Sequence, residues 1–355
     1  MIGISLLTLV PGLSGGSETY ARELCRALRR VGSLGYRVFV PTISVDAADG
    51  LPSSVVSRYR ASRTMPGRMA AMSRAALRPT PLRFELELEA LEALHFPLSV
   101  MLPPVSSPPA ATTIVDLQHE ELPELFGRAE LAYRKAVYGR TIRRSRLVIA
   151  ISGHARETLI ERHGLTPERV RAIPLAVDHE AFRPGELVSR GAYLLYPARP
   201  WRHKNHARLF AAFARLRANR PDLRLVLTGE GDHGPLPPGV EARGHVSRDA
   251  LGQLYRGAAA LAFPSLYEGF GMPVLEAMAC GCPVACSNVT SLPEVAGDAA
   301  RLFDPRDVDD IVAALEEVLA DPEPWAGRGL EHAQAFTWDA CARAHEDVYR
   351  ELCFG

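Results

Sequence analysis

Short apolar runs alternate with longer amphipathic segments through both halves of this 355-residue chain. That alternation is typical of parallel β-sheets whose strands are joined by covering helices. Strands are expected at 2–9, 36–41, 94–100, 112–116 and 147–151, and again at 192–197, 223–228, 259–263, 283–286 and 300–303. The sequence therefore predicts an α/β protein with two doubly wound, Rossmann-like domains.

The boundary between the two domains is expected within 178–190, because residues 182–185 read Phe-Arg-Pro-Gly and break the alternation. This gives a first domain at 1–180 and a second at 181–355. The last segment, 338–352, has the pattern of a helix. With 47% hydrophobic residues, a chain of this length can build two ordinary cores.

Charge and cysteine content narrow the classes of protein to consider. The 41 Lys and Arg are balanced by 41 Asp and Glu, which disfavours a nucleic-acid-binding protein and favours a small-molecule partner. Six cysteines lack the spacing of a secreted disulfide framework, which indicates reduced thiols and a cytoplasmic protein. The apolar run 2–10 is too short to span a bilayer, so it is interpreted as the first strand and not as a signal.

Two carboxylates, Glu268 and Glu276, lie eight residues apart around a glycine-rich helix start. Proline suits the first turn of a helix, which places Glu268 in the preceding loop and Glu276 on the helix. Such a start offers free backbone N–H groups and the positive end of the helix dipole, and both suit a diphosphate without a metal. A carboxylate one turn further can accept from two vicinal hydroxyls, as in a ribose. The residues expected to line the ligand at this start are Gly269, Phe270, Gly271, Met272 and Pro273.

Two cations, Arg199 and Lys204, follow the end of the expected strand 192–197. Ligands of doubly wound sheets bind beyond the carboxyl ends of the strands, so both cations can face the diphosphate. Lys135 and Lys204 are the only lysines in the chain. A lysine retained in this segment indicates a need for a compact point charge in place of a planar guanidinium.

Neither of two further clusters is interpreted as a metal site. Residues 307–310 read Asp-Val-Asp-Asp and could be mistaken for a metal-binding Asp-x-Asp, but an apolar helical segment follows, so an acidic helix start explains them better. The cysteines at 280, 282 and 286 run from a helix end into an apolar strand and are interpreted as small buried residues. No metal and no cofactor are therefore expected.

The stretch around Glu268 and Glu276 resembles the Glu-x7-Glu signature of family 4 retaining glycosyltransferases, which have the GT-B fold. The resemblance extends to 279–284, 292–299 and 196–205. It implies a metal-independent, retaining enzyme that moves a hexose or deoxyhexose from a nucleotide diphosphate sugar to a hydroxyl of a glycan, a lipid-linked glycan or a natural product. The first domain would bind the acceptor and the second the nucleotide sugar, with the final helix packing back on the first domain.

The resemblance also implies roles for individual residues. Glu268 would contact the transferred sugar and Glu276 the ribose, while Arg199 and Lys204 would bind the diphosphate. The implied neighbours of the nucleotide base are His245, Val246, Leu251 and Tyr255, and the implied glycine loop of the first domain contains Gly15 and Gly16.

One family position differs in this chain. Family members carry a His directly before the Asp that ends a first-domain strand, whereas Val115 precedes Asp116 here. His119 is a candidate for part of the catalytic role of that histidine. It could equally contact the acceptor, or be a polar loop residue with neither role.

Segment 51–84 contains seven arginines and no acidic residue, and it is expected to be a mobile, solvated loop. The alternative is a contact with anionic lipid headgroups or with a phosphorylated acceptor.

Two other classes of protein also have doubly wound domains of this kind. An NAD-dependent dehydrogenase is disfavoured because the glycines at 12, 15 and 16 lack the dinucleotide-binding spacing and strand 36–41 does not end in an acidic residue. A non-catalytic partner with the same fold is disfavoured by the complete set of two glutamates and two cations.

Overall fold

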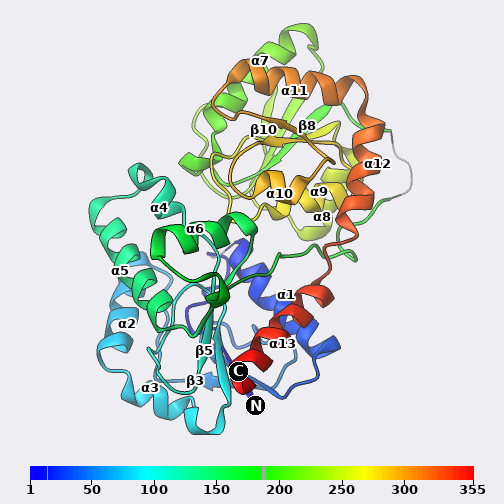
Figure 1. Ribbon diagram of the computed structural model, residues 1–355. Coiled ribbons are helices and arrows are strands. Elements are labelled where there is room, and N and C mark those ends of the chain that lie inside the picture. Colours follow the sequence, from blue (N-terminus) through cyan, green and yellow to red (C-terminus); the bar gives the residue numbers. More distant parts are fainter. Residues whose placement is uncertain (14, 186–188) are drawn as a thin grey trace. The chain divides into compact units, whose positions relative to one another are not determined.

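The computed structural model describes residues 1–13, 15–185 and 189–355 (Figure 1). The chain forms two compact units. The first comprises Met1–Leu175 together with Trp338–Gly355, and the second comprises Ala176–Thr337. Each unit is built on its own parallel sheet, so the α/β class predicted from the sequence is confirmed.

The first unit contains a seven-stranded sheet among its described residues, in the order β3-β2-β1-β4-β5-β6-β7. Every pairing in it is parallel. The strands are β1 (Ile2–Ser5), β2 (Tyr36–Pro41), β3 (Ser53–Val56), β4 (Ala93–Phe96), β5 (Ala110–Ile114), β6 (Leu147–Ala150) and β7 (Val170–Ala172). The order reverses between β1 and β4, which is the switch point of a doubly wound sheet.

Helices cover both faces of this sheet, as parallel connections require. They are α1 (Gly16–Val31), α2 (Met65–Leu77), α3 (Thr80–Glu85), α4 (Gln118–Glu121), α5 (Arg128–Arg144), α6 (Gly153–His163) and α13 (Trp338–Phe354). In α1 the buried residues Tyr20, Ala21, Leu24, Cys25 and Leu28 recur at helical spacing and form one apolar face. That face packs against α13.

A chain of buried polar side chains fixes α13 on the first unit. Tyr349 donates to His95 Nδ1, and His95 Nε2 bonds to Thr113, each at 2.8 Å. Tyr20 lies 2.8 Å from both Thr113 Oγ1 and His345 Nε2. Burial lowers the pKa of His345 to about 4, so its ring is neutral and donates from Nδ1 to the carbonyl of residue 341. Each of the five side chains can therefore donate to the next, in the order Tyr349, His95, Thr113, Tyr20, His345, so all of them have a hydrogen-bond partner.

The second unit contains a six-stranded parallel sheet among its described residues, in the order β10-β9-β8-β11-β12-β13. The strands are β8 (Tyr193–Pro197), β9 (Arg224–Thr228), β10 (Val240–Ala242), β11 (Ala260–Phe263), β12 (Val284–Ser287) and β13 (Arg301–Phe303). The helices are α7 (His206–Asn219), α8 (Arg248–Gly257), α9 (Met272–Ala279), α10 (Leu292–Ala296), α11 (Val308–Ala320) and α12 (Pro322–Ala333). Here the order reverses between β8 and β11.

All ten strands expected from the sequence overlap an observed strand. Three further strands, β3, β7 and β10, were missed, and each lies at an edge of its sheet. These three strands are short and partly exposed, so they lack the apolar run that marks a buried strand. The acidic helix start is confirmed, since Asp307 accepts from the N–H groups of Asp309 and Asp310 at the start of α11.

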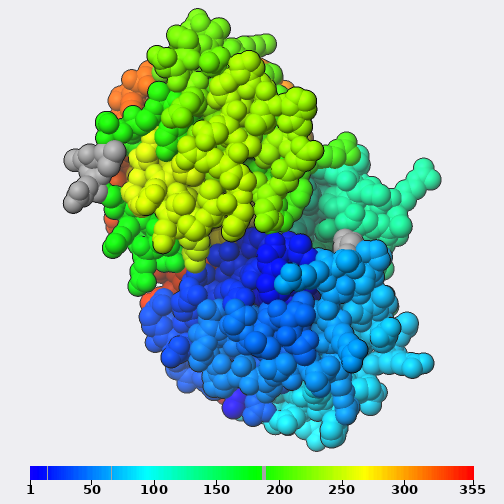
Figure 2. All heavy atoms as spheres, turned by 180° about the vertical axis from the view of Figure 1, so that it is seen from behind, coloured from blue at the N-terminus to red at the C-terminus, as the bar shows by residue number. Residues whose placement is uncertain are grey.

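The expectation of a loop over 51–84 was wrong. The segment contains β3, α2 and α3, and the Thr64 side chain caps α2 by accepting from the N–H of Gly67. Val56 and Leu82 pack into the core of the first unit. Figure 2 shows the face of this unit that the early part of the chain, in blue, covers.

Candidate functional site

The predicted donor-site residues of the second unit gather at its topological switch point. Arg199 and Lys204 follow β8, and Glu268 follows β11, the strand paired with β8. Both loops leave the carboxyl ends of their strands. Doubly wound sheets bind ligands at this position because neighbouring loops part there and expose the helix starts.

Lys204 and Glu268 form an ion pair. The Nζ atom of Lys204 lies 2.5 Å from Oε1 of Glu268, and each side chain is 13% exposed. The ammonium also lies 5.5 Å from the centre of the Phe263 ring. The cation and the carboxylate assigned to diphosphate and sugar are therefore held as a preformed pair, partly shielded from water.

Arg199 is the more accessible cation of the site. Its Nη2 atom lies 3.2 Å from a carboxylate oxygen of Glu230, which follows β9. Its guanidinium lies 5.8 Å from the centre of the half-exposed Trp201 ring. An exposed ion pair of this kind is weak, so a diphosphate can compete for Arg199 at small cost.

Asn205 is a site residue for which the sequence analysis predicted no role. Its backbone is left-handed, with φ of 61°, and it links the turn that carries Lys204 to α7. Its buried amide donates to the carbonyls of Pro264, at 3.0 Å, and Pro305, at 2.7 Å. Asparagine tolerates this backbone region better than most residues, which was the available sequence signal. Asn205 thereby ties the loops after β8, β11 and β13 together.

Glu276 lies on α9, as the sequence predicted. Tyr255 donates to its Oε2 at 3.0 Å. Burial raises the pKa of Glu276 to about 7, and the charge of Asp178 adds to this, whereas the Tyr255 hydrogen bond and the charge of Arg248 oppose it. The carboxyl group of Glu276 therefore titrates near neutral pH.

The start of α9 has the backbone of an anion-binding helix terminus. Gly271 precedes the helix with φ of 109°, and a Cβ there would lie 2.6 Å from a methyl carbon of Leu292. Pro273 occupies the first turn, and no side chain caps the helix. Such a helix start offers free backbone N–H groups and the positive end of the helix dipole.

The residues predicted at the nucleotide base have different surroundings. His245 is exposed, and Val246 and Leu251 are half-buried, so these three are accessible to a ligand. Tyr255 is fully buried and packs on Phe182, with ring centres 5.9 Å apart. Tyr255 therefore acts on Glu276 through its hydroxyl, and the expected contact of Tyr255 with the base does not fit its burial.

The other predicted site residues belong to the first unit. Gly15 has φ of 49° and precedes α1, which begins at Gly16, in the loop that follows β1. His119 is fully buried against Tyr138, with ring centres 4.7 Å apart. Burial lowers the pKa of His119, and neither ring nitrogen has a hydrogen-bond partner among the described residues. This placement counts against the catalytic role predicted for His119.

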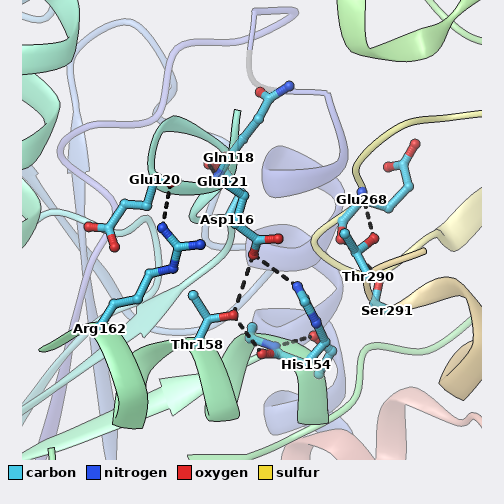
Figure 3. Close-up of polar contacts among 12 residues, drawn as sticks. Asp116, Gln118, Glu120, Glu121, His154, Thr158, Arg162, Glu268, Thr290 and Ser291 are labelled. Carbon is cyan, nitrogen blue, oxygen red and sulfur yellow. Dashed lines mark hydrogen bonds and ion pairs between the residues drawn. The ribbon is translucent and has the colours of Figure 1, made fainter. Parts of the chain in front are cut away.

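The sequence analysis singled out Asp116 but missed the polar side chains of the first unit shown near it, Glu121, His154 and Thr158 (Figure 3). His154 Nε2 lies 2.9 Å from Glu121 Oε1, and Thr158 donates to the same oxygen at 3.3 Å. Asp116, just beyond β5, is half-buried. These side chains come from α4, α6 and the end of β5, and only their proximity in the fold identifies them as a group.

Two kinds of feature are absent from the described part of the chain. It holds no group of three or more His, Cys, Asp or Glu side chains arranged to bind a metal ion. It also holds no helix with the length and apolar character needed to cross a bilayer.

Known structures with the same arrangement define the class of the fold. The chain is similar to sucrose-phosphate synthase from Thermosynechococcus elongatus, with a TM-score of 0.79 and 21% identity over 99% of this chain and 98% of the other. It is also similar to the Anabaena protein HepE in complex with UDP and glucose, with a TM-score of 0.74 and 16% identity over 99% of each chain. These likenesses show that the chain has the GT-B fold.

Sequence comparisons identify the family. Residues 14–181 match "Glycosyltransferase Family 4" and residues 178–334 match "Glycosyl transferases group 1". The chain is 32% identical to the O-antigen chain mannosyltransferase B of Escherichia coli over 68% of this chain and 70% of that protein. It is 30% identical to the MMP alpha-(1->4)-mannosyltransferase of Mycolicibacterium hassiacum over 58% of this chain and 54% of that protein. The chain belongs to glycosyltransferase family 4 and takes its sugar from a nucleotide-sugar donor.

Proposed function

We propose that this glycosyltransferase transfers mannose from a nucleoside diphosphate sugar to a hydroxyl of a glycan, with retention of configuration and without a metal ion. The observation that carries the proposal is the Lys204–Glu268 pair beside the uncapped start of α9. The mannosyltransferase names of two relatives support the choice of sugar.

The second unit would bind the donor. Glu276 accepts from the ribose hydroxyls, and the start of α9 with Arg199 and Lys204 neutralises the diphosphate. Glu268 contacts hydroxyls of the transferred sugar next to Lys204. Fixed cations and backbone dipoles stabilise the charge that develops on a departing diphosphate, as preorganised groups do in other enzymes.

Transfer would occur on one face of the sugar. The bond from the anomeric carbon to the diphosphate oxygen breaks, and a bond to the acceptor oxygen forms on the same face. The acceptor proton passes to the leaving phosphate oxygen. No covalent sugar–enzyme intermediate is needed, which agrees with the engagement of Glu268 by Lys204.

The first unit would bind the acceptor. Asp116 and Glu121 follow β5 and His154 follows the neighbouring strand β6, and all three offer hydrogen-bonding groups for sugar hydroxyls. Their charge suits neutral hydroxyls better than a phosphorylated acceptor. A glycan, free or lipid-linked, fits this chemistry.

A donor screen tests the proposed function. The protein is incubated with GDP-mannose, UDP-glucose, ADP-glucose or dTDP-glucose, a mannose-containing glycan acceptor and excess chelator, and release of the nucleoside diphosphate is measured. We expect release from GDP-mannose that depends on the acceptor and persists in chelator. Release that requires added magnesium or manganese contradicts metal independence. Release from none of the donors favours a non-catalytic partner with this fold.

We also propose that residues 51–84 contact an anionic membrane surface on the cytoplasmic side. Leu77 is 80% exposed and Phe84 is 78% exposed, with Arg74 and Arg78 exposed nearby in sequence. The first unit carries 25 Lys and Arg against 20 Asp and Glu. Apolar side chains flanked by arginines are the combination that binds anionic lipid interfaces.

Vesicle sedimentation tests this contact. The wild type should sediment with phosphatidylglycerol-containing vesicles, and Leu77→Ser with Phe84→Ser should reduce bound protein roughly tenfold, because two apolar anchors are lost. Equal binding by the variant, or equal binding to neutral vesicles, contradicts the proposed surface.

A further inference from the structure

We propose that Thr290 and Ser291 are positioning residues that hold the Glu268 loop ready for the donor sugar. They precede α10 and lie beside the loop after β11 (Figure 3). The inference rests on the proposed contact of Glu268 with the sugar, and it assigns the accuracy of that contact to two residues outside the Glu-x7-Glu segment.

Thr290 holds the backbone of Glu268 itself. The N–H of Glu268 donates to the Thr290 hydroxyl oxygen at 3.1 Å. To make this contact Thr290 adopts a left-handed backbone, with φ of 53°. That region is unfavourable for a β-branched residue, and such outliers gather at functional sites where the surrounding structure maintains them.

Ser291 holds both sides of the same loop. Its hydroxyl lies 3.0 Å from the carbonyl oxygen of Glu268 and 2.7 Å from that of Phe270, and the side chain is fully buried. Serine at a helix start usually caps its own helix. Ser291 stands at the start of α10 but makes no such capping bond.

Both residues thus depart from their usual local behaviour in favour of the same loop. Local rules that are broken together at one place indicate a function that selects the exception. The opposite side of the loop is already fixed, because the N–H of Leu266 donates to the carbonyl of His203 at 2.7 Å and Glu268 pairs with Lys204. Together these contacts hold Glu268 from two directions.

The test separates positioning from stability. In Thr290→Gly the hydroxyl is lost, but glycine favours the observed backbone, so the melting temperature should stay equal or rise. Turnover at saturating donor should fall about ten- to hundredfold, the size expected when a reacting contact is misplaced. Thr290→Ser keeps the hydroxyl oxygen and should retain turnover within about threefold, and the affinity for free nucleoside diphosphate should change little in either variant.

Ser291→Ala and Ser287→Ala form a matched pair. Both serines are fully buried and bond to backbone carbonyls, but Ser287 contacts Phe263 and not the Glu268 loop. Ser291→Ala should lower turnover, whereas Ser287→Ala should lower only the melting temperature. Equal turnover in the two variants overturns the proposal for Ser291.

A double-mutant cycle with Glu268→Ala completes the experiment. If Thr290 acts through Glu268, Thr290→Gly adds no further loss of turnover to Glu268→Ala. Additive losses, or wild-type turnover in Thr290→Gly while Glu268→Ala is impaired, overturn the positioning role. Full activity in Glu268→Ala instead overturns the proposed function of Glu268. If the melting temperature of Thr290→Gly is below that of the wild type, the double-mutant cycle with Glu268→Ala is the measurement that decides whether Thr290 acts through Glu268.

Discussion

Replacing Lys204 by alanine should lower turnover on the order of a hundredfold with saturating donor, because a preorganised cation at a departing group typically contributes that much. Charge increases on the bridging phosphate oxygen as the sugar leaves, so a cation there binds the transition state more strongly than the bound donor. Donor affinity should therefore change less than turnover. Steady-state kinetics with the accepted donor measure both.

The chain supplies the controls for this experiment. Lys135, the other lysine, is exposed on α5, so Lys135→Ala should leave turnover unchanged. Lys204→Arg should restore activity only in part, because a planar guanidinium cannot occupy the position of the ammonium 2.5 Å from Glu268. Wild-type turnover in Lys204→Ala removes Lys204 from the mechanism and leaves Arg199 as the cation of the site.

Replacing Glu276 by alanine should weaken binding of the nucleoside diphosphate by about 1.5 to 3 kcal/mol, the value of hydrogen bonds to a charged group. That is roughly ten- to hundredfold in the dissociation constant. Tyr255 donates to Glu276, so the carboxylate is held at its place on α9 before the ligand arrives. Calorimetric titration measures the change, and equal affinity in the wild type and the variant rules out the ribose contact.

The pH dependence gives a second measure of the same contact. The pKa of Glu276 is raised to about 7, so the free protein must lose a proton before the carboxylate can accept from two hydroxyls. Affinity should therefore rise with pH through about 7 in the wild type. The diphosphate titrates as well, so the wild type is compared with Glu276→Gln. In that variant the affinity changes with pH only through the titration of the ligand. Identical profiles for the two proteins contradict the role of Glu276.

The interior of both sheets could be predicted from the sequence because buried parallel strands are continuous apolar runs. Three of the four edge strands, β3, β7 and β10, could not be, and β10 (Val-Glu-Ala) shows why, since two of its three residues are exposed. Helix α2 was missed because its thirteen residues lack the acidic first turn and wide apolar face that mark a helix in sequence.

The candidate site also has features that the sequence predicts and features that it does not. The placement of Glu268 in a loop and of Glu276 on a helix was predictable, because glycine and proline mark the helix start between them. The contact of Tyr255 with Glu276 and that of Thr290 with Glu268 were not, because each hydrogen bond joins residues more than twenty positions apart. The burial of His119 against Tyr138 of α5 was not predictable for the same reason.

The central claim is metal-independent transfer with retention, and one measurement tests it most directly. The reaction with the accepted donor is followed by proton NMR in excess chelator, and the anomeric configuration of the first product is read before it can equilibrate. We predict a product with the configuration of the donor, formed at the rate seen without chelator. A product of inverted configuration, or no product until a divalent metal is restored, contradicts the account.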